Sequence, residues 1–209
     1  MSNIEEQELK DRLSLIENMI TEGRRTTESW GWTFVLWGVA YYIAIAWSTT
    51  GFGWSLWGHN YLAWPVTMIS GCILTIWIGT RNVGDRAPTT IGRAISALWM
   101  TMGISMFILL LSLSLSGWFN QQAFVAIIAA MLGTTNAASS FILRWKMQFA
   151  CAVVWWAAAS LSCFASIAGS SIIFLVAIFF CQIVFGIYGM VNDSRRRRAA
   201  ASRQGAFHA

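Results

Sequence analysis

The sequence predicts an all-α polytopic membrane protein with six transmembrane helices in three hairpins and a short N-terminal cytoplasmic helix. Three observations predict this fold class. The chain of 209 residues is 56% hydrophobic and only 11% charged, whereas soluble domains carry about 25% charged residues. Its apolar residues form six runs, each long enough for the helix of about 20 residues that spans a 30 Å hydrocarbon core. All fourteen Lys and Arg residues then fall on one side of the membrane.

The basic residues precede the first apolar run, lie between the second and third and between the fourth and fifth, and follow the sixth. The connections after the first, third and fifth runs contain no Lys, Arg, Asp or Glu. Because loops rich in Lys and Arg stay in the cytoplasm, both termini are expected to be cytoplasmic. A missed helix would scatter the charges over both sides, so the pattern also supports the helix count.

Residues 1–29 are predicted to form the cytoplasmic amphipathic helix. One apolar stripe recurs at helical spacing along it, made of Leu9, Leu13, Ile16 and Ile20. The segment 1–28 holds seven acidic and four basic residues, whereas a helix that lies on a membrane usually carries Lys and Arg on its polar face. The stripe is therefore expected to meet a second copy, a cytoplasmic protein or the chain's own loops rather than anionic lipid.

The transmembrane domain is expected over residues 30–191. Its spans are predicted at about 30–49, 61–80, 94–116, 122–143, 148–167 and 171–191. Most tryptophans lie near the ends of these spans, where amphipathic indole rings prefer to sit. Trp155 and Trp156 lie close to the middle of the fifth span instead, and are expected either to face lipid or to fill the bundle interior.

The remaining segment, 192–209, is predicted to be a basic and disordered cytoplasmic tail. Four consecutive basic residues open it and would attract anionic lipid; they are Arg195, Arg196, Arg197 and Arg198. A nucleic-acid partner is not expected, because the basic residues flank membrane spans and are explained by orientation.

The span cores contain no Asp, Glu, Lys, Arg or His. Proton-coupled carriers, pumps and voltage sensors depend on such groups inside the membrane, so all three classes are disfavoured. The two histidines, His59 and His208, lie far apart in the sequence, and no pair of the four cysteines has CxxC spacing. With no HExxH, P-loop or GxSxG motif, the sequence predicts neither an enzyme nor a metal or cofactor site.

The fourth span carries the densest polar patch within the predicted bilayer. Small residues recur every four positions at Ala129, Gly133 and Ala137, a spacing typical of close helix packing. The polar residues beside them are Thr134, Thr135, Asn136, Ser139 and Ser140. In the sixth span, Gln182 would hydrogen-bond to Asn136 or to a backbone carbonyl. We interpret both features as helix packing; the alternative is a polar path for a small solute.

The connection after the first span is rich in aromatic residues. It contains Phe52, Trp54, Trp57, His59 and Tyr61. We interpret this loop as lying on the outer lipid headgroups. The alternative is a site for an organic cation, which aromatic faces attract.

The N-terminal region resembles that of small six-span bacterial inner-membrane proteins of uncharacterised activity. The resemblance rests on Ile16-Glu17-Asn18-Met19-Ile20, Gly23-Arg24-Arg25 and Trp30-Gly31-Trp32, within residues 16–45. It implies a plasma (inner) membrane location and no particular activity. The three-hairpin plan is also similar to that of the six-span acid-resistance membrane proteins, a likeness of fold that does not extend to function.

These features favour a non-enzymatic membrane protein that acts through association, with itself or with a cytoplasmic partner, in a sensing or regulatory role. The alternative is a facilitative channel or exporter for a neutral or weakly charged solute. Downhill flux needs no coupling proton, so that alternative is compatible with spans that lack ionisable groups.

Overall fold

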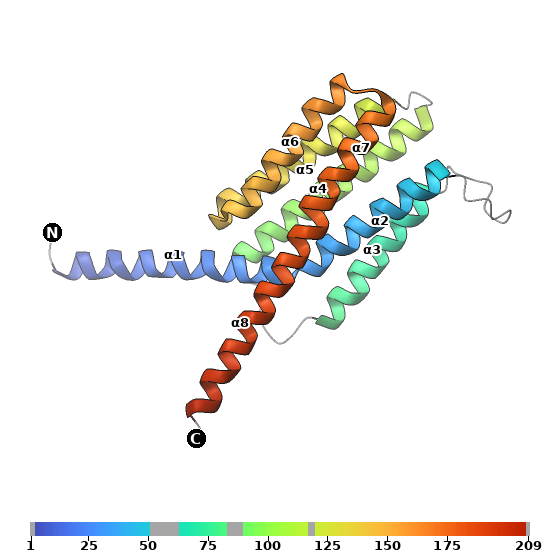
Figure 1. Cartoon of the computed structure of the whole chain (residues 1–209). Coiled ribbons are helices and arrows are strands. Elements are labelled where there is room, and N and C mark those ends of the chain that lie inside the picture. The colour runs from blue at the N-terminus through green and yellow to red at the C-terminus, as the bar shows by residue number, and fades with distance from the viewer. Residues whose placement is uncertain (1–2, 51–62, 83–89, 117–119, 208–209) are drawn as a thin grey trace. The chain divides into compact units, whose positions relative to one another are not determined.

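The computed structural model describes residues 3–50, 63–82, 90–116 and 120–207, and every regular element in these ranges is a helix (Figure 1). The elements are α1 (Asn3–Ser29), α2 (Gly31–Thr50), α3 (Ala63–Asn82), α4 (Thr90–Ser116), α5 (Gln121–Leu143), α6 (Lys146–Phe164), α7 (Ile167–Ile178), the π-helical segment η2 (Phe179–Val184) and α8 (Phe185–Phe207). The predicted all-helical class is confirmed.

Several of these helices are suited to a bilayer. Five described stretches are long and apolar enough to cross a membrane, namely Ala63–Arg81, Thr90–Leu113, Gln122–Leu143, Lys146–Phe164 and Ile167–Arg196. Helices α1 and α2, counted as one broken span, bring the number to six. The helices therefore agree with a multi-pass membrane protein.

The connection between α5 and α6 is tighter than the sequence predicted. Arg144 adopts a left-handed backbone conformation with φ 48°, and the next amide, of Trp145, donates to the Ser140 carbonyl at 3.0 Å. Helix α6 therefore begins at Lys146 rather than at 148. It ends at Phe164 rather than at 167, because Ala165 is extended with φ −81° and ψ 163°.

The C-terminal segment differs most from expectation. Helix α8 continues to Phe207, so the prediction of a disordered tail after the sixth span is wrong. Residues 190–204 contain neither Gly nor Pro and are rich in Ala and Arg, which are among the best helix formers. The basic charge of this segment suggested a solvated coil, but the helical propensity of its residues favours a helical backbone.

The first of two compact units comprises Met1–Thr27 and Ala87–Phe174. Within it α5 packs against both α4 and α6. Helices α5 and α6 run antiparallel: the rings of Phe141 and Phe149 lie 5.4 Å apart, and a Cβ on Gly133 would lie 2.5 Å from Cδ1 of Trp156. The small residues of α5 thus admit the indole of Trp156 against the helix backbone.

The second unit comprises Glu28–Arg86 and Leu175–Ala209. Here α2 packs against α3 and against η2 and α8. The rings of Phe34 and Phe185 meet edge to face at 5.3 Å, and the Tyr42 hydroxyl donates to the Leu175 carbonyl at 2.8 Å. These contacts hold α2 beside the segment that runs from Leu175 through α8.

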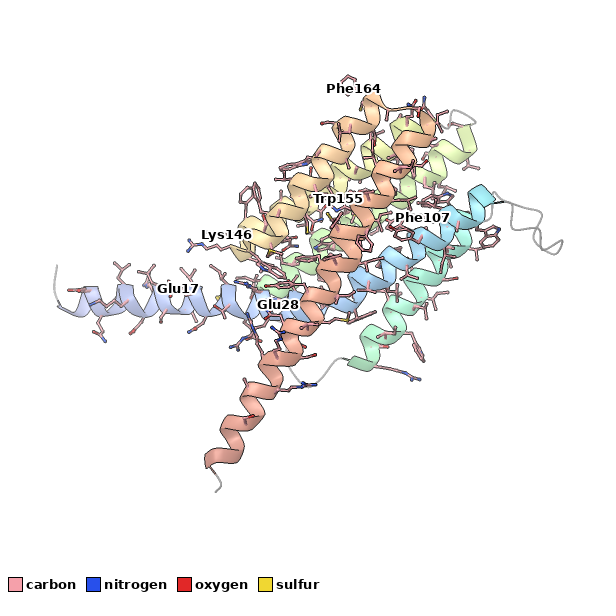
Figure 2. The ribbon with its side chains drawn as sticks, viewed as in Figure 1. Glu17, Glu28, Phe107, Lys146, Trp155 and Phe164 are labelled. Carbon is pink, nitrogen blue, oxygen red and sulfur yellow. The ribbon has the colours of Figure 1, made fainter. Side chains whose placement is uncertain are left out.

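Two helices leave most of their surface unburied. Only 11% of the apolar stretch of α3 and 6% of that of α4 is buried; Phe107 on α4 is one exposed side chain (Figure 2). Hydroxyls on these helices donate to carbonyls of their own helix, as in Thr75 to Gly71 at 2.7 Å and Ser105 to Thr101 at 2.9 Å. Such faces suit hydrocarbon, where a polar group must find its partner within the protein.

Candidate functional site

A buried carboxylate lies where α1 ends, within the second unit. The side chain of Glu28 is 1% exposed. Its Oε1 accepts a hydrogen bond from Asn192 Nδ2 at 2.9 Å, and its Oε2 forms an ion pair with Arg196 Nη1 at 3.0 Å. We call Glu28, Asn192 and Arg196 the α1–α8 clasp. It ties the end of α1 to α8.

Glycines bring the backbones of α2 and α8 together beside the clasp. A Cβ on Gly31 would lie 2.6 Å from the Gly186 carbonyl oxygen, and a Cβ on Gly186 would lie 2.7 Å from that of Gly31. Gly189 lies next to Glu28 in the same way, with its Cβ position 3.4 Å from the Glu28 carbonyl oxygen. This close approach is what lets the Glu28 carboxylate reach a helix of basic residues.

Sequence reasoning missed the clasp, because it counted Glu28 among the acidic residues of a solvated helix and Arg196 among four equivalent arginines. A signal was present in the spacing on α8. Gly186, Gly189, Asn192 and Arg196 recur three or four residues apart, which places them on one helical face.

The polar residues predicted on the fourth span are mostly buried within the first unit. Relative exposure is 5% for Thr135, 2% for Asn136, 0% for Ser139 and 3% for Ser140, whereas Thr134 is exposed. The side chains of Thr134, Thr135, Asn136 and Ser140 donate to carbonyls three or four residues earlier in α5. Helix α5 therefore supplies most of its own polar partners.

Two further buried polar residues lie on α6 and were not singled out from the sequence. Gln148 and Ser162 are both 0% exposed. Neither amide atom of Gln148 has a hydrogen-bond partner in the part of the chain that the structure describes. The α5–α6 register places Gln148 at the level of Ser140. We call Asn136, Ser139, Ser140, Gln148 and Ser162 the polar seam. A helical stripe that runs from Gln148 through Ala152 and Trp155 to Ser162 is the signal that was available.

Gln182 lies in the other unit, in the π-helical segment η2. It is 3% exposed, and its Cβ is 3.0 Å from the position that a Cβ on Gly38 would take. Its Oε1 accepts no hydrogen bond from the described residues. The predicted bond between Gln182 and Asn136 stays a prediction; the amide nitrogen of Asn136 donates to the Leu132 carbonyl at 2.8 Å.

The two central tryptophans of the fifth span have different surroundings. Trp155 is fully buried, with its ring 5.6 Å from that of Phe174 (Figure 2). Trp156 is 38% exposed and covers Gly133. One residue thus fills the interior while its neighbour lies at the unit's surface.

The apolar stripe of α1 is uncovered over most of its length. Leu9 is 50% exposed, Leu13 54% and Ile16 53%, and residues 6–18 are all exposed, Glu17 among them (Figure 2). Ile20 is partly buried. Ion pairs flank the stripe on the helix surface, with Lys10 Nζ 2.7 Å from Glu6 Oε1 and Arg12 Nη2 2.5 Å from Glu8 Oε1.

The other end of α1 is packed. A Cβ on Gly23 would lie 2.5 Å from Cγ2 of Ile91, and the Arg24 guanidinium lies 5.3 Å from the ring centre of Trp145. Helix α1 is therefore packed within the first unit at Gly23 and Arg24, whereas residues 6–18 are exposed.

The outer aromatic loop with Phe52, Trp54, Trp57, His59 and Tyr61 lies outside the described residues. Among the residues that are described, no group of three His, Cys, Asp or Glu side chains is placed to hold a metal ion. The four cysteines are free thiols, two buried and two exposed.

The chain matches no protein-family model, no curated protein and no solved structure.

Proposed function

We propose that this chain is a non-enzymatic protein of the plasma (inner) membrane that assembles with a second copy of itself through α1. In this proposal six helices span the membrane as three hairpins, and both termini lie in the cytoplasm. The placement of every Lys and Arg on one side supports that orientation. Reporter fusions at residue 209 would test it: a green fluorescent reporter should fluoresce there, and an alkaline phosphatase fusion should be inactive.

The observation that carries the proposal is the bare apolar stripe of α1. Three large aliphatic side chains in register, each about half exposed, lie on a helix of 27 residues that is outside the predicted membrane domain. A soluble helix with such a stripe normally buries it. The stripe repeats at four-, three- and four-residue intervals from Leu9 to Ile20, which is the spacing of the a and d positions of a coiled coil.

The charges beside the stripe favour a second copy as the occupant. With Leu13 and Ile20 at a positions, Arg12 falls at g and Glu17 at the following e. In a parallel pair these two positions face each other across the interface and set partner choice. Glu5 and Lys10 repeat the same spacing with the signs reversed. Two parallel copies would therefore exchange their intrahelical ion pairs for complementary pairs between chains.

A parallel arrangement is compatible with insertion in one membrane. Two copies inserted in the same orientation present α1 on the same side of the bilayer. Confinement also raises the effective concentration of one α1 near another, which offsets the shortness of a stripe that covers only two heptads.

The proposal is tested by native mass spectrometry of the full chain in lipid nanodiscs. Wild-type protein should give the mass of a dimer, and Leu13→Asp with Ile16→Asp should give a monomer that is still inserted. Leu15→Asp is the matched control: Leu15 is 61% exposed but lies off the stripe, so its variant should remain dimeric. A monomeric wild type, or equal behaviour of the two variants, would refute self-association through α1. A monomer that uses α1 to retain a soluble protein would assign the stripe to a cytoplasmic partner instead.

Charge exchange tests the register. Arg12→Glu alone should weaken the dimer, and so should Glu17→Arg alone. The double variant restores opposite charges at both positions and should recover the dimer. Recovery is specific to a parallel pair, so its absence would argue against that arrangement.

One observation keeps the facilitative path as a second candidate. Asn136 Oδ1 and Ser139 Oγ are buried and accept no hydrogen bond from the described residues, as expected of groups that meet water or a polar solute. In that case Asn136→Leu should stop solute flux in liposomes without unfolding the protein. The self-bonded hydroxyls of the same helix favour packing, which is why association is the leading proposal.

A further inference from the structure

Helix α8 has two faces with different partners inside its unit. One face meets α2 through Phe185, Gly186 and Gly189 and continues into the α1–α8 clasp through Asn192 and Arg196. The adjoining face, which shares Asn192 with this one, leaves Val184, Ile187 and Val191 about half exposed. It forms a groove of about 340 Å³ lined by Val184, Ile187, Tyr188, Val191, Asn192 and Arg195.

The groove changes from apolar to basic along its length. The side chains at its apolar end are about half exposed: Val184 44%, Ile187 46% and Val191 44%. At the other end stand Asn192 and Arg195, where the membrane-crossing stretch Ile167–Arg196 finishes. The distance from Val184 to Arg195 along the helix is about 16 Å at 1.5 Å per residue, so hydrocarbon and headgroup depths are both covered.

The clasp makes the arginines of the C-terminal segment differ in their partners. Arg196 is committed to Glu28, whereas Arg195 is exposed and forms no ion pair with any residue that the structure describes. Arg195, which has no ion pair among the described residues, thus lies at the basic end of the groove. Tyr188, 40% exposed, adds an aromatic side chain to the lining between Ile187 and Val191.

We propose that this groove binds one anionic phospholipid, with an acyl chain against Val184, Ile187 and Val191 and its phosphate at Arg195. The basic end complements a phosphate, and the order of the lining groups matches the order of tail and headgroup in a lipid. It relies on the proposed cytoplasmic position of the C-terminus, because anionic lipid in the cytoplasmic leaflet is what a basic segment there would meet. Free phosphate would use only one end of such a site.

The test is native mass spectrometry with phosphatidylglycerol and, in parallel, phosphatidylcholine. The protein should retain one phosphatidylglycerol per chain more strongly than phosphatidylcholine. Arg195→Gln should weaken that retention about tenfold, the loss of one charge-assisted hydrogen bond. Arg198→Gln is the matched control. It removes an exposed tail arginine outside the groove, so only diffuse attraction, about fivefold at most, should be lost.

Val191→Trp tests the acyl part of the site. It should fill the groove and reduce retention of phosphatidylglycerol without changing the charge. Circular dichroism would confirm that each variant remains helical. Equal losses for the two arginine variants, equal retention of the two lipids, or displacement by inorganic phosphate at millimolar concentration would each overturn the proposal.

This experiment is separate from the test of self-association. Lipid retention is counted per chain and is measured equally well on the Leu13→Asp with Ile16→Asp variant, in which α1 no longer pairs. A monomer that keeps its lipid would refute only the α1 dimer. A dimer without bound phosphatidylglycerol would refute only the lipid site.

Discussion

The Oε2 atom of Glu28 lies 3.0 Å from Nη1 of Arg196, and the two side chains differ sharply in their access to solvent. The carboxylate is 1% exposed and the arginine side chain 42%. The pair is therefore asymmetric, because a buried carboxylate depends on its partners whereas a half-exposed guanidinium also has water. Loss of the arginine should consequently matter more than loss of the acid.

Arg196→Gln should lower the free energy of unfolding by about 2 kcal/mol, because the buried carboxylate loses a charge-assisted contact to a half-exposed arginine. Glu28→Gln should cost less, about 1 kcal/mol, since its amide still bonds to neighbours. Both are measurable by titration with sodium dodecyl sulfate in mixed micelles, followed by tryptophan fluorescence. Arg195→Gln, beside the clasp but outside it, should change the midpoint very little. Equal costs for Arg196 and Arg195 variants would contradict the clasp.

Gly31→Ala should destabilise the crossing of α2 and α8 by about 1–3 kcal/mol, because the new methyl group would lie 2.6 Å from a backbone oxygen that cannot turn away. Gly103→Ala is the control. A Cβ there has nothing within 4 Å, so the change should be neutral or stabilising by up to about 1 kcal/mol. The same detergent titration compares them, and a neutral Gly31→Ala would mean that the helices are not in this close contact.

Gln148→Leu should stabilise the protein by about 1–2 kcal/mol, because it removes a buried amide whose two polar atoms find no partner in the described chain. Gln122→Leu should have the opposite effect, about 1 kcal/mol, since the Gln122 amide donates to the Ala165 carbonyl. The two glutamines thus predict opposite shifts of one unfolding midpoint. Destabilisation by Gln148→Leu would instead point to bound water or another partner in the polar seam.

Trp155→Ala should cost about 3–5 kcal/mol, because a fully buried ring in contact with Phe174 is replaced by a void. Trp156→Ala should cost less, since that ring is 38% exposed and loses mainly its contact with Gly133. Thermal aggregation in detergent gives the order of the two variants. The reverse order would place the wrong tryptophan inside the unit.

The helical class and most helix boundaries could be predicted from the lengths of the hydrophobic runs. In a membrane every backbone N–H and C=O group needs a hydrogen-bond partner within the protein, which leaves few alternatives to a helix. The burial of individual side chains was harder to predict from the sequence. Nearly every face of each span is apolar, so the apolar pattern did not separate Trp155 from Trp156, and the polar stripe from Gln148 to Ser162 was overlooked beside it. The tail was mispredicted because its charge was given more weight than the helical propensity of its Ala and Arg residues.

The α1–α8 clasp was missed for a different reason. It joins residues from opposite ends of the sequence, so the shared face of Asn192 and Arg196 on α8 did not identify Glu28 as their partner. Only the close approach at Gly31 and Gly186 brings Glu28 to α8. By contrast, the stripe of α1 is a local pattern and could be identified directly from Leu9, Leu13, Ile16 and Ile20.

The π-helical segment η2 makes the continuous helix from α7 to α8 sensitive to the insertion or deletion of a single residue. Its wide turn lets Ile178 and Ile183, five residues apart, both lie near Gly38, whereas an α-helix brings together residues three or four apart. One added residue rotates everything beyond it by about 100°. The side chains of α8 are therefore rotated about the helix axis relative to those of α7. Deletion or insertion of one residue at η2 would rotate the clasp and the proposed lipid groove together, and would leave α7 unchanged.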